Sequence, residues 1–175
     1  MDASLWVAVV TGGTAAITGW VTSQGNARAA KVQAEASQRV QLLTQRREAR
    51  RTAYLEVIDH AHGTGQRYFE VHGLRITAPE SERYAAELER LRDELRSAYD
   101  PLMRCVRVAE LEGPPAVAEQ AQALLEAVYE TNRSLFHLAR NDTDGARDRF
   151  TDARNRFHQC SEGFIAAAQK AINDA

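Results

Sequence analysis

Residues 146–171 read ARDRFTDARNRFHQCSEGFIAAAQKA, and this stretch decides the fold class. Its apolar side chains recur at alternating steps of four and three residues, with a phenylalanine at every seventh position: Phe150, Phe157 and Phe164. This 3.5-residue period is that of an α-helix that packs at a shallow angle against other helices through one apolar seam. The segment therefore predicts one helix of an all-α bundle.

The same period recurs in two segments that precede this one. One seam runs from Tyr84 to Cys105 and another from Val117 to Leu138. A fourth, looser apolar face is formed by Tyr54, Ile58, Ala61, Phe69 and His72. Four helices joined by short loops must alternate in direction, so residues 54–175 are predicted to form an antiparallel up-down four-helix bundle.

Turn and capping signals separate these predicted helices. Thr77-Ala-Pro-Glu80 has the pattern of a capping box with an early proline, which predicts the start of a helix. Gly113-Pro114-Pro115 is expected to end one helix and open the next. Asn141-Asp-Thr-Asp-Gly145 supplies a turn and an N-cap for the last helix.

Two positions conflict with regular helices. Asp100-Pro101 falls inside the second apolar series, where proline removes a backbone hydrogen bond, and we expect a bend rather than a chain reversal. Gly63-Thr-Gly65 lowers helix propensity in the first bundle helix. A hinge is one reading of these glycines, and room for close helix packing is the one we favour.

Composition bounds the class of protein. The 175 residues are 44% hydrophobic, 26% charged and 7% aromatic, which suits a helical globular chain of about one domain. Two cysteines cannot form a disulfide framework, so a reducing compartment is expected. A net charge of −2 argues against a strongly basic nucleic-acid binder.

The charge is distributed in three zones. No charged residue occurs from Ala3 to Ala27. Residues 28–51 hold seven basic and two acidic side chains, whereas the chain from Tyr54 onward holds 15 basic and 21 acidic ones. We therefore expect three segments with different roles: residues 1–27, 28–53 and 54–175.

The uncharged zone contains LWVAVVTGGTAAITGWV at residues 5–21. A bilayer core requires about 20 mostly apolar helical residues, which the whole uncharged run of 25 provides with some tilt. Trp6 and Trp20 bracket the segment as interface anchors, and basic residues follow only on its C-terminal side. We predict a single transmembrane helix in the inner (plasma) membrane, with the N-terminus outside and the body cytoplasmic. The alternatives are a buried core helix and an amphipathic surface helix.

Small residues within this segment predict helix association. Ala8, Gly12 and Ala16 recur every four residues, a spacing that lets two helix backbones approach closely in lipid. Threonines lie on another face of this helix, so a pore or a membrane-active effector, with a role in defence as one possibility, is kept as an alternative function. A homo-oligomer held by the span is the first expectation.

Residues 28–53 are predicted to continue as a basic helical stalk. A thin apolar seam typical of coiled coils is formed by Val32, Ala36, Val40 and Leu43. A basic patch follows at Arg46, Arg47, Arg50 and Arg51. On a straight helix this patch lies roughly 37 Å beyond the span, several Debye lengths from the lipid headgroups. We expect the arginines to be solvated or to face an acidic protein partner; a stalk lying flat on the membrane and contacts to a phosphate backbone remain alternatives.

The sequence predicts no catalytic, cofactor or metal site. The five histidines form no Glu-x-x-His motif, and the spacing of His60 and His62 places them on different helix faces. If Gly145 is aligned with the invariant glycine of a calcium loop, Arg140 and Thr151 fall at the first and twelfth positions, where calcium needs carboxylates. Phosphate-binding and nucleophile motifs are absent from the sequence. A small-ligand site in the bundle near His72 or His137 is kept as an alternative.

The stretch Arg50-Arg51-Thr52-Ala53-Tyr54 after an N-terminal span, together with Val106–Pro114, resembles uncharacterised small single-pass membrane proteins of actinobacteria. The resemblance implies one span followed by a cytosolic helical body, and it transfers no activity or site residue. Residue patterns and resemblance together predict a membrane-anchored helical interaction or scaffold module that self-associates without catalysis.

Overall fold

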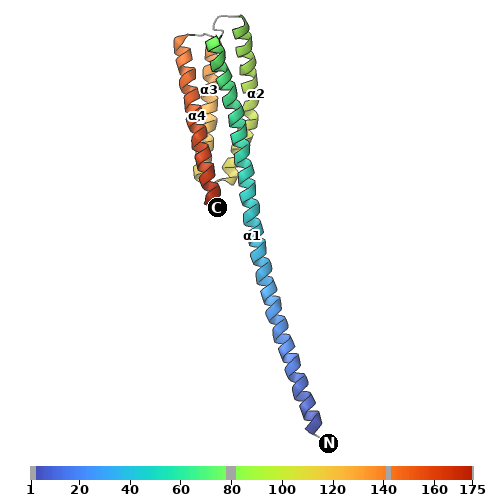
Figure 1. The fold of residues 1–175 in the computed structure, drawn as a ribbon. Coiled ribbons are helices and arrows are strands. Elements are labelled where there is room, and N and C mark those ends of the chain that lie inside the picture. Colours follow the sequence, from blue (N-terminus) through green and yellow to red (C-terminus); the bar gives the residue numbers. More distant parts are fainter. Residues whose placement is uncertain (1–2, 78–81, 141–142, 175) are drawn as a thin grey trace. The chain divides into compact units, whose positions relative to one another are not determined.

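The protein is all-α. A computed structural model describes the backbone of residues 3–77, 82–140 and 143–174, and the side chains of residues 31–74, 84–140 and 143–174. Within the described residues the helices are α1 (Ala3–Thr77), α2 (Glu82–Glu112), α3 (Pro115–Arg140) and α4 (Asp144–Asn173). Their antiparallel up-down arrangement confirms the predicted four-helix bundle (Figure 1).

The chain divides into two compact units. The first, Met1–Arg46, contains the N-terminal part of α1, and the second, Arg47–Ala175, contains the rest of α1 with the other three helices. In the second unit the first core side chains are Ala53 and Tyr54. The three helices that follow α1 supply the remaining walls of the core (Figure 1).

Aromatic pairs establish how α1 runs against α4. Tyr54 contacts Phe164 edge-on with ring centroids 6.2 Å apart, and Tyr68 contacts Phe157 edge-on at 5.2 Å. The earlier tyrosine thus meets the later phenylalanine, which requires the two helices to be antiparallel. Edge-to-face pairs of this kind stabilise a core beyond the apolar area they bury.

Polar contacts show the same antiparallel order between α1 and α2. Arg67 Nε lies 3.3 Å from Glu94 Oε2, and a guanidinium nitrogen of Arg90 lies 4.0 Å from Glu70 Oε2. These pairs are partly exposed, so each contributes little to stability. They define the α1/α2 register without being the source of the fold's stability.

Most of the expected helix boundaries are observed. Gly113 and Pro114 separate α2 from α3, and Pro115 is the first residue of α3. Thr143 caps α4, because its side-chain oxygen accepts a hydrogen bond from the backbone N–H of Ala146 at 3.3 Å. The chain also continues as one helix through Pro101, without a reversal.

Two local expectations were wrong. Thr77 is helical as the last residue of α1, so it does not cap a new helix; the rest of this signal, residues 78–80, lies outside the described residues, and α2 is described from Glu82. A proline signal is as compatible with the end of one helix as with the start of the next. Phe69 is 68% exposed, and its neighbour Tyr68 occupies the core position instead. The phenylalanines of α4 set this register, since Tyr68 packs between two of them.

The hydroxyl groups of two buried tyrosines differ in their partners. The Tyr68 hydroxyl donates to Asn132 Oδ1 at 2.8 Å and lies 3.2 Å from the carbonyl oxygen of Val128. The Tyr54 hydroxyl is buried with no hydrogen-bond partner among the described residues. Burial raises the pKa of both phenols, and Arg50 opposes the increase at Tyr54.

This difference predicts opposite responses to removal of the hydroxyl. Tyr68→Phe is expected to lower the free energy of unfolding by about 1 kcal/mol because it breaks a satisfied buried hydrogen bond. Tyr54→Phe is expected to leave stability unchanged or to raise it, because it removes a desolvated group without a partner. Urea unfolding of the full chain, followed by near-UV circular dichroism, measures both. An equal loss in the two variants would show that the hydroxyl of Tyr54 is satisfied in solution.

Candidate functional site

Residues predicted to act in the membrane lie outside the part of the chain whose side chains are described. This applies to the packing set Ala8, Gly12 and Ala16 and to the interface anchors Trp6 and Trp20. Among the described residues, no helix has a segment with the length and apolarity needed to cross a bilayer. The anchor over residues 1–27 therefore stays a prediction.

The four arginines of the basic patch have different surroundings. Arg46 ends the first unit, and Arg47 and Arg51 are exposed in the second. Arg50 is half-buried, and its Nε donates to the carbonyl oxygen of Glu112 at 2.6 Å. Glu112 is the last residue of α2, where free carbonyls and the helix dipole favour a cation. Arg50 thus has a partner within its own unit, which leaves Arg47 and Arg51 as the exposed arginines of the basic patch in that unit.

The described part of the first unit exposes an apolar seam. Val32, Val40 and Leu43 are 65%, 62% and 58% exposed. All the side chains from Lys31 to Arg46 are exposed, so no described residue of this unit covers the seam. Burial of such side chains is the main driving force for helix association in water.

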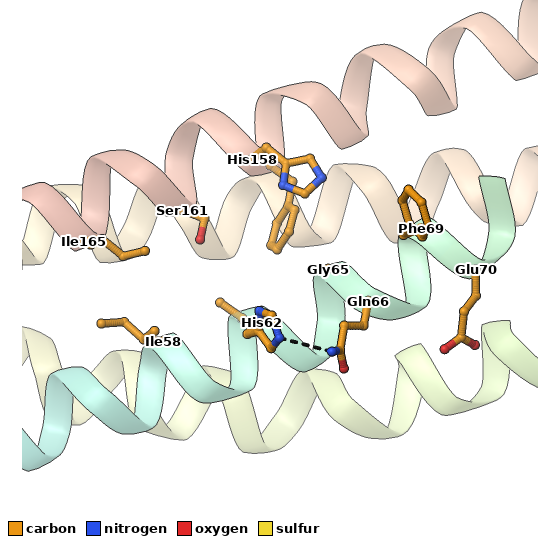
Figure 2. A pocket seen from close by; sticks show the side chains of 11 residues that line it. Ile58, His62, Gly65, Gln66, Phe69, Glu70, His158, Ser161 and Ile165 are labelled. Atoms are coloured by element: carbon orange, nitrogen blue, oxygen red, sulfur yellow. Dashed lines mark hydrogen bonds between the residues drawn. The ribbon is translucent and has the colours of Figure 1, made fainter. Parts of the chain in front are cut away.

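A groove of about 590 Å³ lies between α1 and α4 in the second unit (Figure 2). Its α1 side is formed by Ile58, His62, Gly65, Gln66 and Phe69, and its α4 side by Phe157, His158, Ser161 and Ile165. At the floor, a Cβ atom on Gly65 would lie 3.2 Å from Phe157 Cε1. This close approach of α1 to α4 favours the packing interpretation of the Gly63-Thr-Gly65 stretch over a hinge.

The chemistry of the α1/α4 groove suits apolar contact. The imidazole Nε2 of His62 lies 3.1 Å from Gln66 Nε2, and none of the hydrogen bonds of the described residues joins Ser161 to either histidine of the groove (Figure 2). Within the described residues, no three His, Cys, Asp or Glu side chains are grouped to hold a metal ion. The groove thus offers an apolar floor with imidazoles at its rim.

The two histidines kept as ligand candidates differ in exposure. His137 is exposed and lines a polar hollow between α3 and α4 with Arg133 and Arg149. His72 is half-buried on α1. The cysteines Cys105 and Cys160 are free and half-buried, and burial raises the pKa of the Cys105 thiol, so its thiolate is disfavoured.

A second groove, of about 530 Å³, lies between α2 and α3. It contains three aromatic residues, Tyr99, Tyr129 and Phe136, together with Arg92 and Arg96. The residue pattern of a single helix does not predict this groove, because each helix contributes only part of its wall. The signal that could have found it is the position of these aromatics outside the apolar seams, at places where a solvated helix face is usually polar.

Comparison of the chain with protein-family models, curated proteins and solved structures found no match.

Proposed function

We propose that this chain is a membrane-anchored helical interaction module that self-associates and has no catalytic step. Residues 1–27 anchor it in the plasma membrane, residues 28–53 form a basic stalk, and residues 54–175 form a bundle on the cytoplasmic side. The proposal combines the uncharged N-terminal segment with the four-helix arrangement of the second unit.

The exposed seam at Val32, Val40 and Leu43 is the observation that carries the self-association. An isolated helix gains little stability from intrinsic propensity and depends on packing of an apolar face. Because these side chains recur on one side of the helix, a second copy in parallel orientation can cover them as in a coiled coil. A shared membrane anchor keeps the copies parallel and raises their effective concentration.

Charge supports contact between copies beyond this seam. Residues 28–51 carry seven basic and two acidic side chains, and the chain from Tyr54 onward carries 21 acidic against 15 basic ones. Opposite charges steer association and disfavour wrong partners. The exposed Arg47 and Arg51 are suited to meet the acidic bundle of a neighbouring copy or another acidic protein. The net charge of −2 makes nucleic acid the less favoured partner.

Cross-linking in membranes tests the proposal. The chain contains two lysines, Lys31 and Lys170, so a Lys170→Arg background leaves Lys31, next to the seam, as the reactive side chain. We expect the tagged full chain to stay in carbonate-washed membranes and to form a covalent dimer with a membrane-permeable bis-succinimidyl ester. The double variant Val40→Glu/Leu43→Glu is expected to remain in the membrane and to lose at least tenfold of the dimer, because it places charges in the seam.

A matched control changes charge without touching the seam. Gln38→Glu/Gln41→Glu introduces the same two charges on the opposite side of the helix and is expected to retain the dimer. Release of the chain by carbonate would show that residues 1–27 do not anchor it in the membrane. The dimer yield would then test association through the seam separately. Equal dimer yields in the seam and control variants would overturn self-association through the stalk.

A further inference from the structure

Three aromatic side chains outside the apolar seams converge on the α2/α3 groove. Tyr99 of α2 and the pair Tyr129 and Phe136 of α3 line it, together with the buried seam residues Leu95 and Leu135. Contact between apolar ring surface and water is unfavourable, and Tyr129 and Phe136 are 55% and 40% exposed. The groove's volume of about 530 Å³ lies within the range of small-molecule sites.

Guanidinium groups are placed around one of these rings. The Cζ atoms of Arg92 and Arg140 lie 5.6 Å and 5.4 Å from the centroid of the Phe136 ring. Cation–π contact holds both cations beside an apolar surface. Arg92 is also paired with Glu89, at 2.9 Å. Arg140 has no ion-pair partner among the described residues, so it brings an unneutralised positive charge to this end of the groove.

The side-chain amide of Asn132, in the wall of the groove, is held by a hydrogen bond from the core. The Oδ1 atom of Asn132 accepts the hydrogen bond from the buried Tyr68 hydroxyl, which leaves its amide N–H groups as donors. Asn132 also lines the groove. Because Tyr68 holds the amide oxygen, the side chain of Asn132 keeps its N–H groups as hydrogen-bond donors in the wall of the groove.

The charges are arranged asymmetrically along the groove. Arg96 and Asp100 both line it, one helical turn apart, and the described residues contain no ion pair to either. Arg92 contacts the Phe136 ring, Arg96 follows it by about one turn of α2, and Asp100 lies about one turn further on. Arg96 therefore brings an unpaired guanidinium group to the groove, and guanidinium groups bind carboxylates well.

We propose that the α2/α3 groove binds a small planar aromatic acid. Its ring packs against the aromatic side chains that line the groove, its carboxylate pairs with Arg96, and Asn132 donates to a polar substituent. The site is separate from the stalk seam, so this inference goes beyond the proposed self-association and does not depend on it.

Fluorine NMR titration of the full chain with 4-fluorobenzoate tests the site. We expect saturable binding with a Kd at or below about 1 mM, which is the weak affinity usual for so small a ligand. Arg96→Gln is expected to weaken binding at least fivefold by removing the charge, and Phe136→Leu at least threefold by removing one of the aromatic rings that line the groove. Both residues are exposed, so these variants keep the fold. His62→Gln, in the α1/α4 groove, is the matched control and should bind as the parent chain does.

Two further probes separate the chemistry. 4-Fluorobenzylammonium keeps the ring and reverses the charge, and cyclohexanecarboxylate, added as a competitor, keeps the charge and removes the aromatic ring. The proposal requires that the ammonium binds at least tenfold more weakly and that the cyclohexane acid displaces fluorobenzoate poorly. Comparable binding of the ammonium, unchanged binding in Arg96→Gln, an equal loss in His62→Gln, or no saturable binding up to about 1 mM would each overturn it.

Discussion

Replacing Phe157 by alanine is expected to lower the free energy of unfolding by about 3–5 kcal/mol, the usual cost of deleting a large buried aromatic ring. Phe157 is fully buried, lies edge-on to Tyr68 with centroids 5.2 Å apart, and packs against the backbone of α1 at Gly65. Its removal would leave a cavity where α4 meets α1. Because Gly65 has no side chain that could move into the space, collapse of the neighbouring helix is the only relief.

The measurement is urea unfolding of the full chain, followed by near-UV circular dichroism of the tyrosines. Phe69→Ala is the matched control, since it deletes the same ring from a side chain that is 68% exposed, and it should cost less than about 1 kcal/mol. Similar losses in the two variants would show that the register of α1 differs from the one described, with Phe69 rather than Tyr68 in the core.

Replacing Pro101 by alanine is expected to raise the free energy of unfolding by about 1–3 kcal/mol. Pro101 lies inside α2, where its ring clashes with the preceding turn and its nitrogen donates no hydrogen bond to the carbonyl of Ser97. Alanine supplies that N–H group and has the highest helix propensity. The expected gain is at the lower end of this range if α2 has already adapted its backbone to the proline.

Pro115→Ala is the control for this prediction. Pro115 is the first residue of α3, a position where proline costs nothing because the N–H group would be unpaired and the backbone angle is already suitable. This variant should leave stability unchanged or lower it slightly, through greater freedom of the unfolded chain. The urea midpoint of each full-chain variant gives the comparison. A loss of stability in Pro101→Ala would indicate that the bundle is built around the proline and requires its geometry.

Packing of the last three helices could be predicted because their apolar residues follow a strict period. Leu88, Leu91 and Leu95 of α2 are buried as the four-and-three spacing required, and so are Phe150, Phe157 and Phe164 of α4. The first bundle helix was harder to place, because its two adjacent aromatics, Tyr68 and Phe69, satisfy a helical period equally well. Contacts with α4 decide between them, and those contacts are not contained in the periodicity of α1.

The candidate sites could be predicted only in part. The stalk seam was predicted from its spacing, and the described residues of the seam are exposed, so they are available to a partner. Arg50 was grouped with its neighbours, because nothing in the local sequence signals that the helix end at Glu112, 62 residues away, lies beside it. The aromatic groove was missed for the same reason, since Arg92 and Phe136 meet only at one register of the antiparallel helices α2 and α3, and the period of each helix does not determine that register.

The sequence by itself determined the helical class, the number of bundle helices, the faces that are buried in the last three of them and the uneven distribution of charge. These features follow from local composition and period, which act within a few turns of one helix. Only the tertiary structure decided which tyrosine hydroxyl has a partner, which arginine is held by a helix terminus and where aromatic rings and guanidinium groups form a groove. The reason is physical: such features arise from two helices at a given register, and a shift of one turn would place different side chains opposite each other.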